Sequence, residues 1–346
     1  YEMAPIIKEL EKEGHDLCVV HTGQHYDNNM SNNILKDLEL RKPDYHLGIM
    51  SGSHAQQTAS IMVEFEKICI EQHPRIVIVA GDVNSTLACA LVAAKLHIKV
   101  AHVESGLRSF DRKMPEEINR IMTDHISDFL FTTEDSGNLN LENEGIPKSK
   151  IHFVGNCMID SLLQYIGNAK ELSIWRKYNK IDSVYAVVTL HRPSNVDNKT
   201  ELQKYIGIIN EISQMFGVVF PCHPRTMKNI KDFNLSLSSS VHLIESLSYI
   251  EFISLLSKAK LVLTDSGGIQ EETTILKIPC ITLRDNTERP VTIDVGTNVL
   301  AGTNYKNILS EVNKVYNDDI KTSNIPKYWD GKSAQRISKI ISNFIK

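Results

Sequence analysis

Several predicted strands of this 346-residue chain end on side chains that can move protons or bind anions. Short apolar runs lead directly into Asp82, into Glu104, into His191, and into the pair Asp265 and Ser266. In open parallel sheets, ligands bind outside the carboxyl ends of the strands. If these strands are parallel, the side chains lie on the side of the sheet where a ligand binds. Carboxylates and imidazole rings are the usual general acids and bases there.

Glu104 is the more informative of the two strand-end carboxylates. Glutamate is a poor helix cap and is unusual at the end of a buried strand, so we interpret Glu104 as a functional residue. Asp82, taken alone, is better explained as a turn or cap residue before Asn84, because aspartate often has that role after a strand.

A helix is predicted to begin at Pro115, and its first turn carries Glu116 and Glu117. Helical spacing predicts a buried stripe made of Ile118, Ile121, Met122, His125, Ile126 and Phe129. On the opposite face, Glu116 and Arg120 can pair at i, i+4. We interpret Glu117 as a solvated acid that the helix dipole favours. Glu116 is a candidate site residue because its helix begins soon after Glu104.

The segment DSGGIQEE (265–272) is a candidate anion site. Ser266, Gly267 and Gly268 open a predicted helix, and the free N–H groups at such a helix end suit a pyrophosphate. The glycines allow a phosphate to approach the backbone closely. Glu272 could accept hydrogen bonds from both hydroxyls of a ribose. An ordinary capped helix that packs tightly on a sheet explains the same residues equally well.

His191 is followed by Arg192 and a turn, which favours a surface loop at a strand end where a cation faces phosphate. A satisfied core histidine is the alternative. The sequence contains no HExxH motif and no CxxC pair, so we expect no metal site. No GxGxxG or Walker motif is present either.

The elements that position these residues form two series of short Val- and Ile-rich runs separated by helical periods. The predicted strands are 15–23, 75–82, 98–104, 128–134 and 150–156, then 183–192, 216–224, 241–246, 260–268 and 278–285. A helix that follows Asp82 is predicted to be capped by Asn84 or Ser85. This alternation predicts an α/β fold with two doubly wound, Rossmann-like lobes facing a cleft.

The expected lobes are residues 1–165 and 166–333, with a polar helical passage after Asp160. The chain opens on an amphipathic helix (1–15), before which this architecture leads us to expect a strand and a phosphate-facing turn.

The charge balance argues against nucleic acid and membrane partners. The chain has 38 basic and 42 acidic residues, for a net charge of −4, and no apolar run approaches the length of a membrane span. The six cysteines are widely separated, which is typical of reduced thiols. We therefore expect a cytoplasmic protein.

Six motifs, in one order along nearly the whole chain, resemble those of the non-hydrolysing UDP-N-acetylglucosamine 2-epimerases. They are GDVNST (81–86), HVESGLRS (102–109), PEEINR (115–120), TLHRPSN (189–195), DSGGIQEE (265–272) and LRDNTERP (283–290). The resemblance implies a fold like that of the B-type glycosyltransferases, with a UDP-sugar in the cleft. It also implies that a last helix, about 334–346, packs back on the first lobe. One position departs from the family, since Glu2 stands where a lysine is usual.

The resemblance also implies roles for individual residues. The catalytic set is Asp82, Glu104, Glu116 and His191; the substrate-binding set is Arg120, Arg192, Ser266, Gly267, Gly268 and Glu272. Bacterial members bind a second UDP-GlcNAc through a Gln-His pair, which here is Gln24 and His25. The implied reaction removes the C2 proton of the sugar while UDP leaves C1, then adds UDP back, and it needs no cofactor. A homodimer is expected.

Several alternatives share these residues. The sugar could differ, for example a diacetamido uronic acid. A hydrolysing relative would be expected to lack TGQHYD (22–27), and a B-type glycosyltransferase would have no use for three converging carboxylates. A non-catalytic UDP-sugar binder is the alternative from a different functional class.

Overall fold

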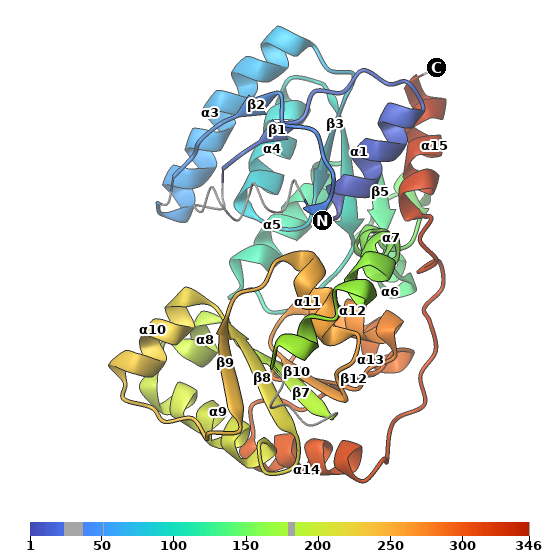
Figure 1. The fold of residues 1–346 in the computed structure, drawn as a ribbon. Coiled ribbons are helices and arrows are strands. Elements are labelled where there is room, and N and C mark those ends of the chain that lie inside the picture. The colour runs from blue at the N-terminus through green and yellow to red at the C-terminus, as the bar shows by residue number, and fades with distance from the viewer. Residues whose placement is uncertain (24–36, 51, 179–183, 346) are drawn as a thin grey trace. The chain divides into compact units, whose positions relative to one another are not determined.

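The computed structural model describes residues 1–23, 37–50, 52–178 and 184–345. The chain divides into two compact units, coloured by residue number in Figure 1. Unit 1 comprises Tyr1–Ser161 and Lys327–Lys346, and unit 2 comprises Leu162–Pro326. Each unit is built on parallel strands, so the predicted α/β class is confirmed.

Unit 1 contains a four-stranded parallel sheet in the order β3-β4-β5-β6 and a separate parallel pair, β1-β2. The strands are β1 (Val20–His21), β2 (Tyr45–His46), β3 (Ile76–Ala80), β4 (Lys99–Ser105), β5 (Phe129–Thr132) and β6 (Ile151–Phe153). The helices are α1 (Met3–Lys12), α3 (His54–Gln72), α4 (Asn84–Lys95), α5 (Pro115–Ile126), α6 (Asp135–Asn143), α7 (Cys157–Leu172) and α15 (Ser333–Ile345). Helix α7 runs across the division between the units.

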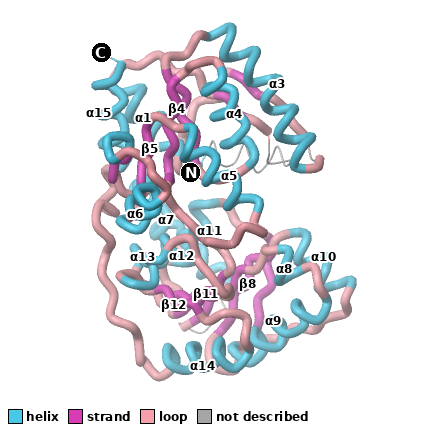
Figure 2. Tube along the Cα trace, turned by 180° about the vertical axis from the view of Figure 1, so that it is seen from behind, coloured by secondary structure: helices cyan, strands magenta, loops and turns pink. Residues whose placement is uncertain are grey.

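The helices of unit 1 cover both faces of the four-stranded sheet. On one face, α1 and α15 lie side by side and share an apolar cluster with β4 and β5 (Figures 1 and 2). On the other face, α3 and α4 bury Ile61, Phe65 and Ala88 against Val79 and Val100. Helix α4 begins after Val83, which makes no side-chain cap, so the prediction of an Asn84 or Ser85 cap was wrong.

Unit 2 contains a six-stranded parallel sheet in the order β9-β8-β7-β10-β11-β12. Its strands are β7 (Tyr185–Thr189), β8 (Gly217–Cys222), β9 (Val241–Glu245), β10 (Leu261–Thr264), β11 (Cys280–Thr282) and β12 (Asn298–Leu300). Its helices are α8 (Pro193–Val196), α9 (Lys199–Ile212), α10 (Pro224–Asp232), α11 (Tyr249–Leu256), α12 (Gly267–Leu276), α13 (Pro290–Asp294) and α14 (Tyr305–Tyr316). The strand order reverses between β7 and β10, and this switch point is where doubly wound sheets bind ligands.

All ten predicted strands are present; nine are shorter than predicted, and β4 has the predicted length but is shifted by one residue. The sequence analysis missed β2 and β12, which are only two and three residues long. Such short strands leave no periodic pattern to detect. Among the described residues, no helix is long and apolar enough to cross a membrane.

Candidate active site

Helix α5 buries a polar face, which contradicts the predicted apolar stripe. Its buried residues are Glu117, Asn119, Arg120, Thr123 and Asp124. Met122 is instead 45% exposed, and Ile118 and Ile121 are half-buried. The physical reason is that α5 packs beside the turns that follow β3 and β4, whose backbone groups need polar partners. Asn119 Nδ2, for example, donates to the Asp82 carbonyl at 2.9 Å.

Glu117 is the centre of this polar face. Its side chain is only 1% exposed, so the prediction of a solvated helix start was wrong. One carboxylate oxygen accepts from Ser109 N at 3.0 Å and Ser109 Oγ at 2.9 Å, and the other accepts from Phe110 N at 2.9 Å. Glu117 therefore fixes the loop between β4 and α5.

Arg120 joins Glu117 to the candidate acid Asp82. Its guanidinium is buried and donates to Glu117 Oε2 through Nη1 and to Asp82 Oδ2 through Nη2. The sequence had suggested that Arg120 lies on a solvated face, opposite the buried stripe, but the structure buries it. The arrangement holds the Asp82 carboxylate in one orientation at the carboxyl end of β3.

Glu104, the last residue but one of β4, has a strained conformation. Its φ is 66°, in the left-handed region that side chains other than glycine rarely adopt. The register between β4 and β5 shifts at this point, between Val103 and Ser105. Bulges of this kind often lie beside active sites, where they redirect a side chain. Glu104 and Glu116 are both half-buried.

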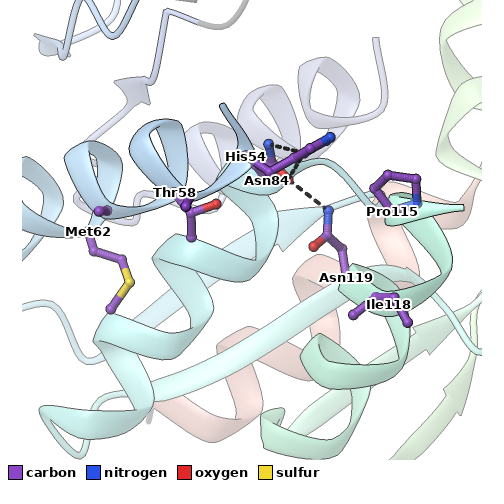
Figure 3. Close-up of a pocket in the computed structure, with 9 residues that line it drawn as sticks. His54, Thr58, Met62, Asn84, Pro115, Ile118 and Asn119 are labelled. Atoms are coloured by element: carbon purple, nitrogen blue, oxygen red, sulfur yellow. Dashed lines mark hydrogen bonds between the residues drawn. The ribbon is translucent and has the colours of Figure 1, made fainter. Parts of the chain in front are cut away.

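Unit 1 also has an open groove of about 490 Å³ on its α3, α4 and α5 side (Figure 3). At one end, His54, Asn84 and Asn119 form a chain of hydrogen bonds, with Asn119 Nδ2 3.2 Å from Asn84 Oδ1. The remaining lining residues are Ala55, Thr58, Ala59, Met62, Pro115 and Ile118. No predicted site residue lines this groove, and its mainly apolar wall suits another apolar surface better than a nucleotide.

Asp265 organises the candidate site of unit 2, at the switch point between β7 and β10. It is fully buried and accepts from the backbone N–H groups of His191 and Arg192 and from Asn195 Nδ2. His191 Nδ1 lies 2.8 Å from Asp265 Oδ1 while the imidazole remains 52% exposed. The structure therefore excludes the alternative of a core histidine. Burial acts to raise the pKa of Asp265, but hydrogen bonding from His191 holds that pKa below its ordinary value.

The N-terminus of α12 lies at the same switch point. Ser266, Gly267 and Gly268 are partly exposed there, as an anion site requires. Arg192 Nε donates to the Asp265 carbonyl at 2.9 Å, so this cation belongs to the same cluster. Ser266 is the N-cap residue but its side chain makes no capping hydrogen bond.

The sequence analysis assigned no role to the buried ion network beside Gly267. Arg289 donates to Glu271 Oε1 at 2.7 Å and to Glu288 Oε1, and Arg284 donates to Glu288 Oε2 at 2.7 Å. A Cβ at Gly267 would lie 2.5 Å from Arg289 Nη1. The motif LRDNTERP was the only signal, because nothing in its spacing shows that its charges pair under α12.

Glu272 lies on α12 and is almost completely buried, with 3% of its surface exposed. Burial, together with the charge of Glu271, raises the pKa of Glu272 to about 8. The predicted allosteric residues Gln24 and His25 lie outside the described residues. Within the described ranges, no group of three or more His, Cys, Asp or Glu side chains could hold a metal ion.

A family model described as UDP-N-acetylglucosamine 2-epimerase matches residues 8–342 of this chain. The UDP-N-acetylglucosamine 2-epimerase of Methanocaldococcus jannaschii is 45% identical over 350 residues, which cover 99% of this chain and 95% of the relative. The chain belongs to the UDP-N-acetylglucosamine 2-epimerase family. The resemblance seen in the sequence is thus confirmed, and with it an isomerase family.

Solved structures of this epimerase family agree with the assignment. The M. jannaschii enzyme in complex with UDP-GlcNAc and UDP matches with a TM-score of 0.91, over 99% of this chain and 96% of that chain. The Neisseria meningitidis UDP-GlcNAc 2-epimerase bound to UDP-GlcNAc matches with a TM-score of 0.89 at 32% identity, over 99% and 96% of the two chains. A related enzyme, the UDP-2,3-diacetamido-2,3-dideoxy-D-glucuronate 2-epimerase of Pseudomonas aeruginosa, is 39% identical over 96% of this chain and 93% of its own.

Proposed function

We propose that this chain interconverts UDP-GlcNAc and UDP-ManNAc, to supply precursors for surface polysaccharide. The observation that carries the proposal is its 45% identity, over 99% of its length, to a UDP-N-acetylglucosamine 2-epimerase. The strained Glu104 and the oriented Asp82 supply the acid–base groups that such a reaction needs.

The proposed reaction has two steps with one intermediate. In the first, a carboxylate takes the C2 proton, the C1–O bond breaks, and its electron pair leaves with UDP, so that C1 and C2 become doubly bonded. In the second, the UDP oxygen attacks C1 and C2 receives a proton on the opposite face. We assign the proton transfers to Asp82, Glu104 and Glu116, because a carboxylate on each face of the sugar allows inversion at C2.

Unit 2 is proposed to hold UDP. The N–H groups that open α12 at Ser266, Gly267 and Gly268, with the guanidinium of Arg192, suit the pyrophosphate and the charge it gains on leaving. His191, whose Nδ1 lies 2.8 Å from Asp265 Oδ1, is proposed to donate through its other ring nitrogen to the leaving phosphate oxygen. Glu272 is proposed to accept from the ribose hydroxyls.

The experiment is incubation of the protein with UDP-GlcNAc in deuterated water, followed by NMR at C2. Epimerisation through the glycal replaces the C2 proton by deuterium and produces UDP-ManNAc. A folded protein that binds UDP yet exchanges no C2 proton, from UDP-GlcNAc or from the diacetamido uronic acid sugar considered next, is a UDP-sugar binder and not an epimerase.

A diacetamido uronic acid sugar is the second candidate, favoured by the 39% identity to the P. aeruginosa enzyme. Parallel assays with UDP-GlcNAc and the UDP-linked diacetamido uronic acid decide between them. The physiological substrate is the one with the higher kcat/KM.

We also propose a homodimer formed through the α3 and α5 side of unit 1. Val63 and Ile70, seven residues apart on α3, are 55% and 56% exposed. The same helix supplies Ala55, Ala59 and Met62 to the apolar groove of Figure 3. Exposed apolar surface of this kind favours burial against a second copy. Light scattering should give the mass of two chains, and Ile70→Glu should give one. The control Leu139→Glu, at a 60% exposed position on α6, should stay dimeric. A monomeric wild type would contradict the proposal.

For location we propose the cytoplasm. The six cysteine thiols are free, and five of them are buried. Free buried thiols are typical of reducing compartments. Cell fractionation with an antibody against the chain tests this, and recovery outside the cytoplasmic fraction would contradict it.

A further inference from the structure

His102 is a completely buried histidine on β4, two residues before Glu104. Its Nδ1 lies 2.7 Å from Asp124 Oδ1 on α5, and its Nε2 lies 2.8 Å from the carbonyl oxygen of Gly81. A carbonyl can only accept, and so can an ionised carboxylate. Both ring nitrogens therefore donate, and the ring is an imidazolium.

The charges around His102 favour this state. Burial acts to lower the pKa of His102, but the charge and hydrogen bond of Asp124 raise that pKa above its ordinary value. The charge of Glu104, on the same strand, also raises the pKa of His102. On the other side of Asp124, Arg108 Nη1 lies 2.7 Å from Oδ2, so one carboxylate lies between two cations.

Asp124 carries the connection past Glu104. Its Oδ2 also accepts from Gly106 N at 3.1 Å. Arg108 is in turn held by Glu144, with Nε and Nη2 each 2.7 Å from a carboxylate oxygen. The network thus reaches the backbone on both sides of the β4 bulge.

Three residues in this region have positive φ: Gly81 at 69°, Glu104 at 66° and Gly106 at 80°. His102 bonds to the peptide group of the first, directly before Asp82, and Asp124 bonds to that of the third, two residues after Glu104. Glycine adopts such a φ readily, but Glu104 is strained, and a strained backbone persists only where its surroundings hold it.

We propose that His102 is the positioning residue for both candidate catalytic carboxylates. It ties the Gly81–Asp82 turn to the strand that carries Glu104 and, through Asp124, fixes the bulge on which Glu104 stands. This inference rests on the proposed function. It adds a residue that acts on the two carboxylates through the backbone and is not proposed to contact the substrate.

The first test is independent of activity. In protein labelled with ¹⁵N at histidine, a long-range ¹H–¹⁵N spectrum reports whether each ring nitrogen carries a proton. The His102 signals are those that a His102 variant loses. We expect two protonated nitrogens at neutral pH. A single protonated nitrogen overturns the proposal, because one of the two bonds would then be missing.

The second test uses three substitutions. The amide nitrogen of His102→Gln reaches the place of Nε2 and can still donate to Gly81, whereas that of His102→Asn takes the place of Nδ1 and can still donate to Asp124. His102→Leu donates to neither. We expect kcat for C2 exchange to fall about 10- to 100-fold in Gln and Asn and further in Leu, the scale for misplaced catalytic groups. KM and the Kd for UDP should stay within about twofold, because unit 2 is proposed to bind the nucleotide.

His152→Gln is the matched control, since His152 is a half-buried ring on β6 that stacks on Phe129. Its kcat should stay close to that of the wild type. A folded His102→Leu with wild-type kcat overturns the proposal, as does a loss of UDP affinity equal to the loss of kcat. If the wild type exchanges no C2 proton from either UDP-sugar, the proposed function fails. The ring spectrum alone then supports or overturns the inference that His102 donates to both Gly81 and Asp124.

Discussion

Glu104 and Asp82 are the residues on which the proposed chemistry depends most. We expect Glu104→Gln and Asp82→Asn each to lower the rate of C2 exchange at least ~100-fold, the usual scale for loss of a positioned acid or base. Circular dichroism should show an intact fold. Asp111→Asn, a half-buried acid in the loop between β4 and α5, is the control and should retain full activity. Normal turnover in both site variants would refute the assignment.

Glu272 should make the stability of the chain depend on pH. The pKa of Glu272, raised to about 8 by burial from an ordinary value of 4.5, means that the folded chain holds a proton that the unfolded chain releases. The contribution of Glu272 to the free energy of unfolding therefore falls as the pH rises between about 4.5 and about 8. Glu272→Gln cannot ionise, so its stability relative to the wild type should increase across this range.

Urea unfolding at several pH values measures this difference. Glu311→Gln, a half-buried carboxylate on α14 that pairs with Lys314, should show no such trend. If the wild type and Glu272→Gln lose stability in parallel as the pH rises, Glu272 is ionised in the folded chain and the interpretation fails.

At the scale of the element, the buried polar face of α5 gives two adjacent glutamates different roles, because Glu117 is buried in it and Glu116 is not. Glu117→Gln weakens a buried charge network with Arg120, and breaking such a pair costs about 3–5 kcal/mol of folding free energy. Glu116→Gln, at a half-buried position in the first turn of α5, should change stability by only about 0.5 kcal/mol, the scale for most surface substitutions, but should lower C2 exchange. Denaturant unfolding and the exchange assay, run on both variants, check this. Equal losses of stability would show that α5 packs differently.

The N-terminus of α12 should tolerate no side chain at Gly267. An added Cβ would lie 2.5 Å from Arg289 Nη1 and 2.9 Å from Glu288 Oε1, and both side chains are held in the buried ion network. We expect Gly267→Ala to displace this network and to weaken UDP binding about 10-fold or more, measured by calorimetry. In Gly167→Ala on α7, the new Cβ meets no atom within 4 Å, so UDP affinity should be unchanged. Its stability should rise by about 0.4–1 kcal/mol. Unchanged affinity in Gly267→Ala would move the phosphate site elsewhere.

At the scale of the whole molecule, we propose allosteric control by a second UDP-GlcNAc through Gln24 and His25. If UDP-GlcNAc at a second site stabilises the active state, an enzyme that is given only UDP-ManNAc lacks its activator at the start of the reaction. The reverse reaction, started from UDP-ManNAc alone, should show a lag that a trace of UDP-GlcNAc abolishes. Progress curves with and without that trace measure it, and Gln24→Ala should alter the lag. A reverse reaction at full rate from the start would exclude such control.

The sequence by itself determined which side chains lie near the carboxyl end of each predicted strand and the order of the predicted elements. An apolar Val- and Ile-rich run closed by Asp82, Glu104 or His191 is a local pattern, so each residue's place on its strand could be predicted. The family resemblance followed from six such local motifs. The predicted lengths were less accurate, because side-chain patterns do not show where backbone pairing stops.

Only the tertiary structure decided which side chains meet. Helix α5 has an apolar periodicity, yet it buries Glu117 and Arg120. The reason is that the turns after β3 and β4 pack against this face, and their polar groups need hydrogen-bond partners. Three other features also depend on partners that are distant in the sequence. They are the left-handed backbone of Glu104, the hydrogen bonds that Asp265 accepts, and the two hydrogen bonds that His102 donates. Periodicity records how apolar a face is, whereas hydrogen-bond partners and buried charges are set by packing between distant segments.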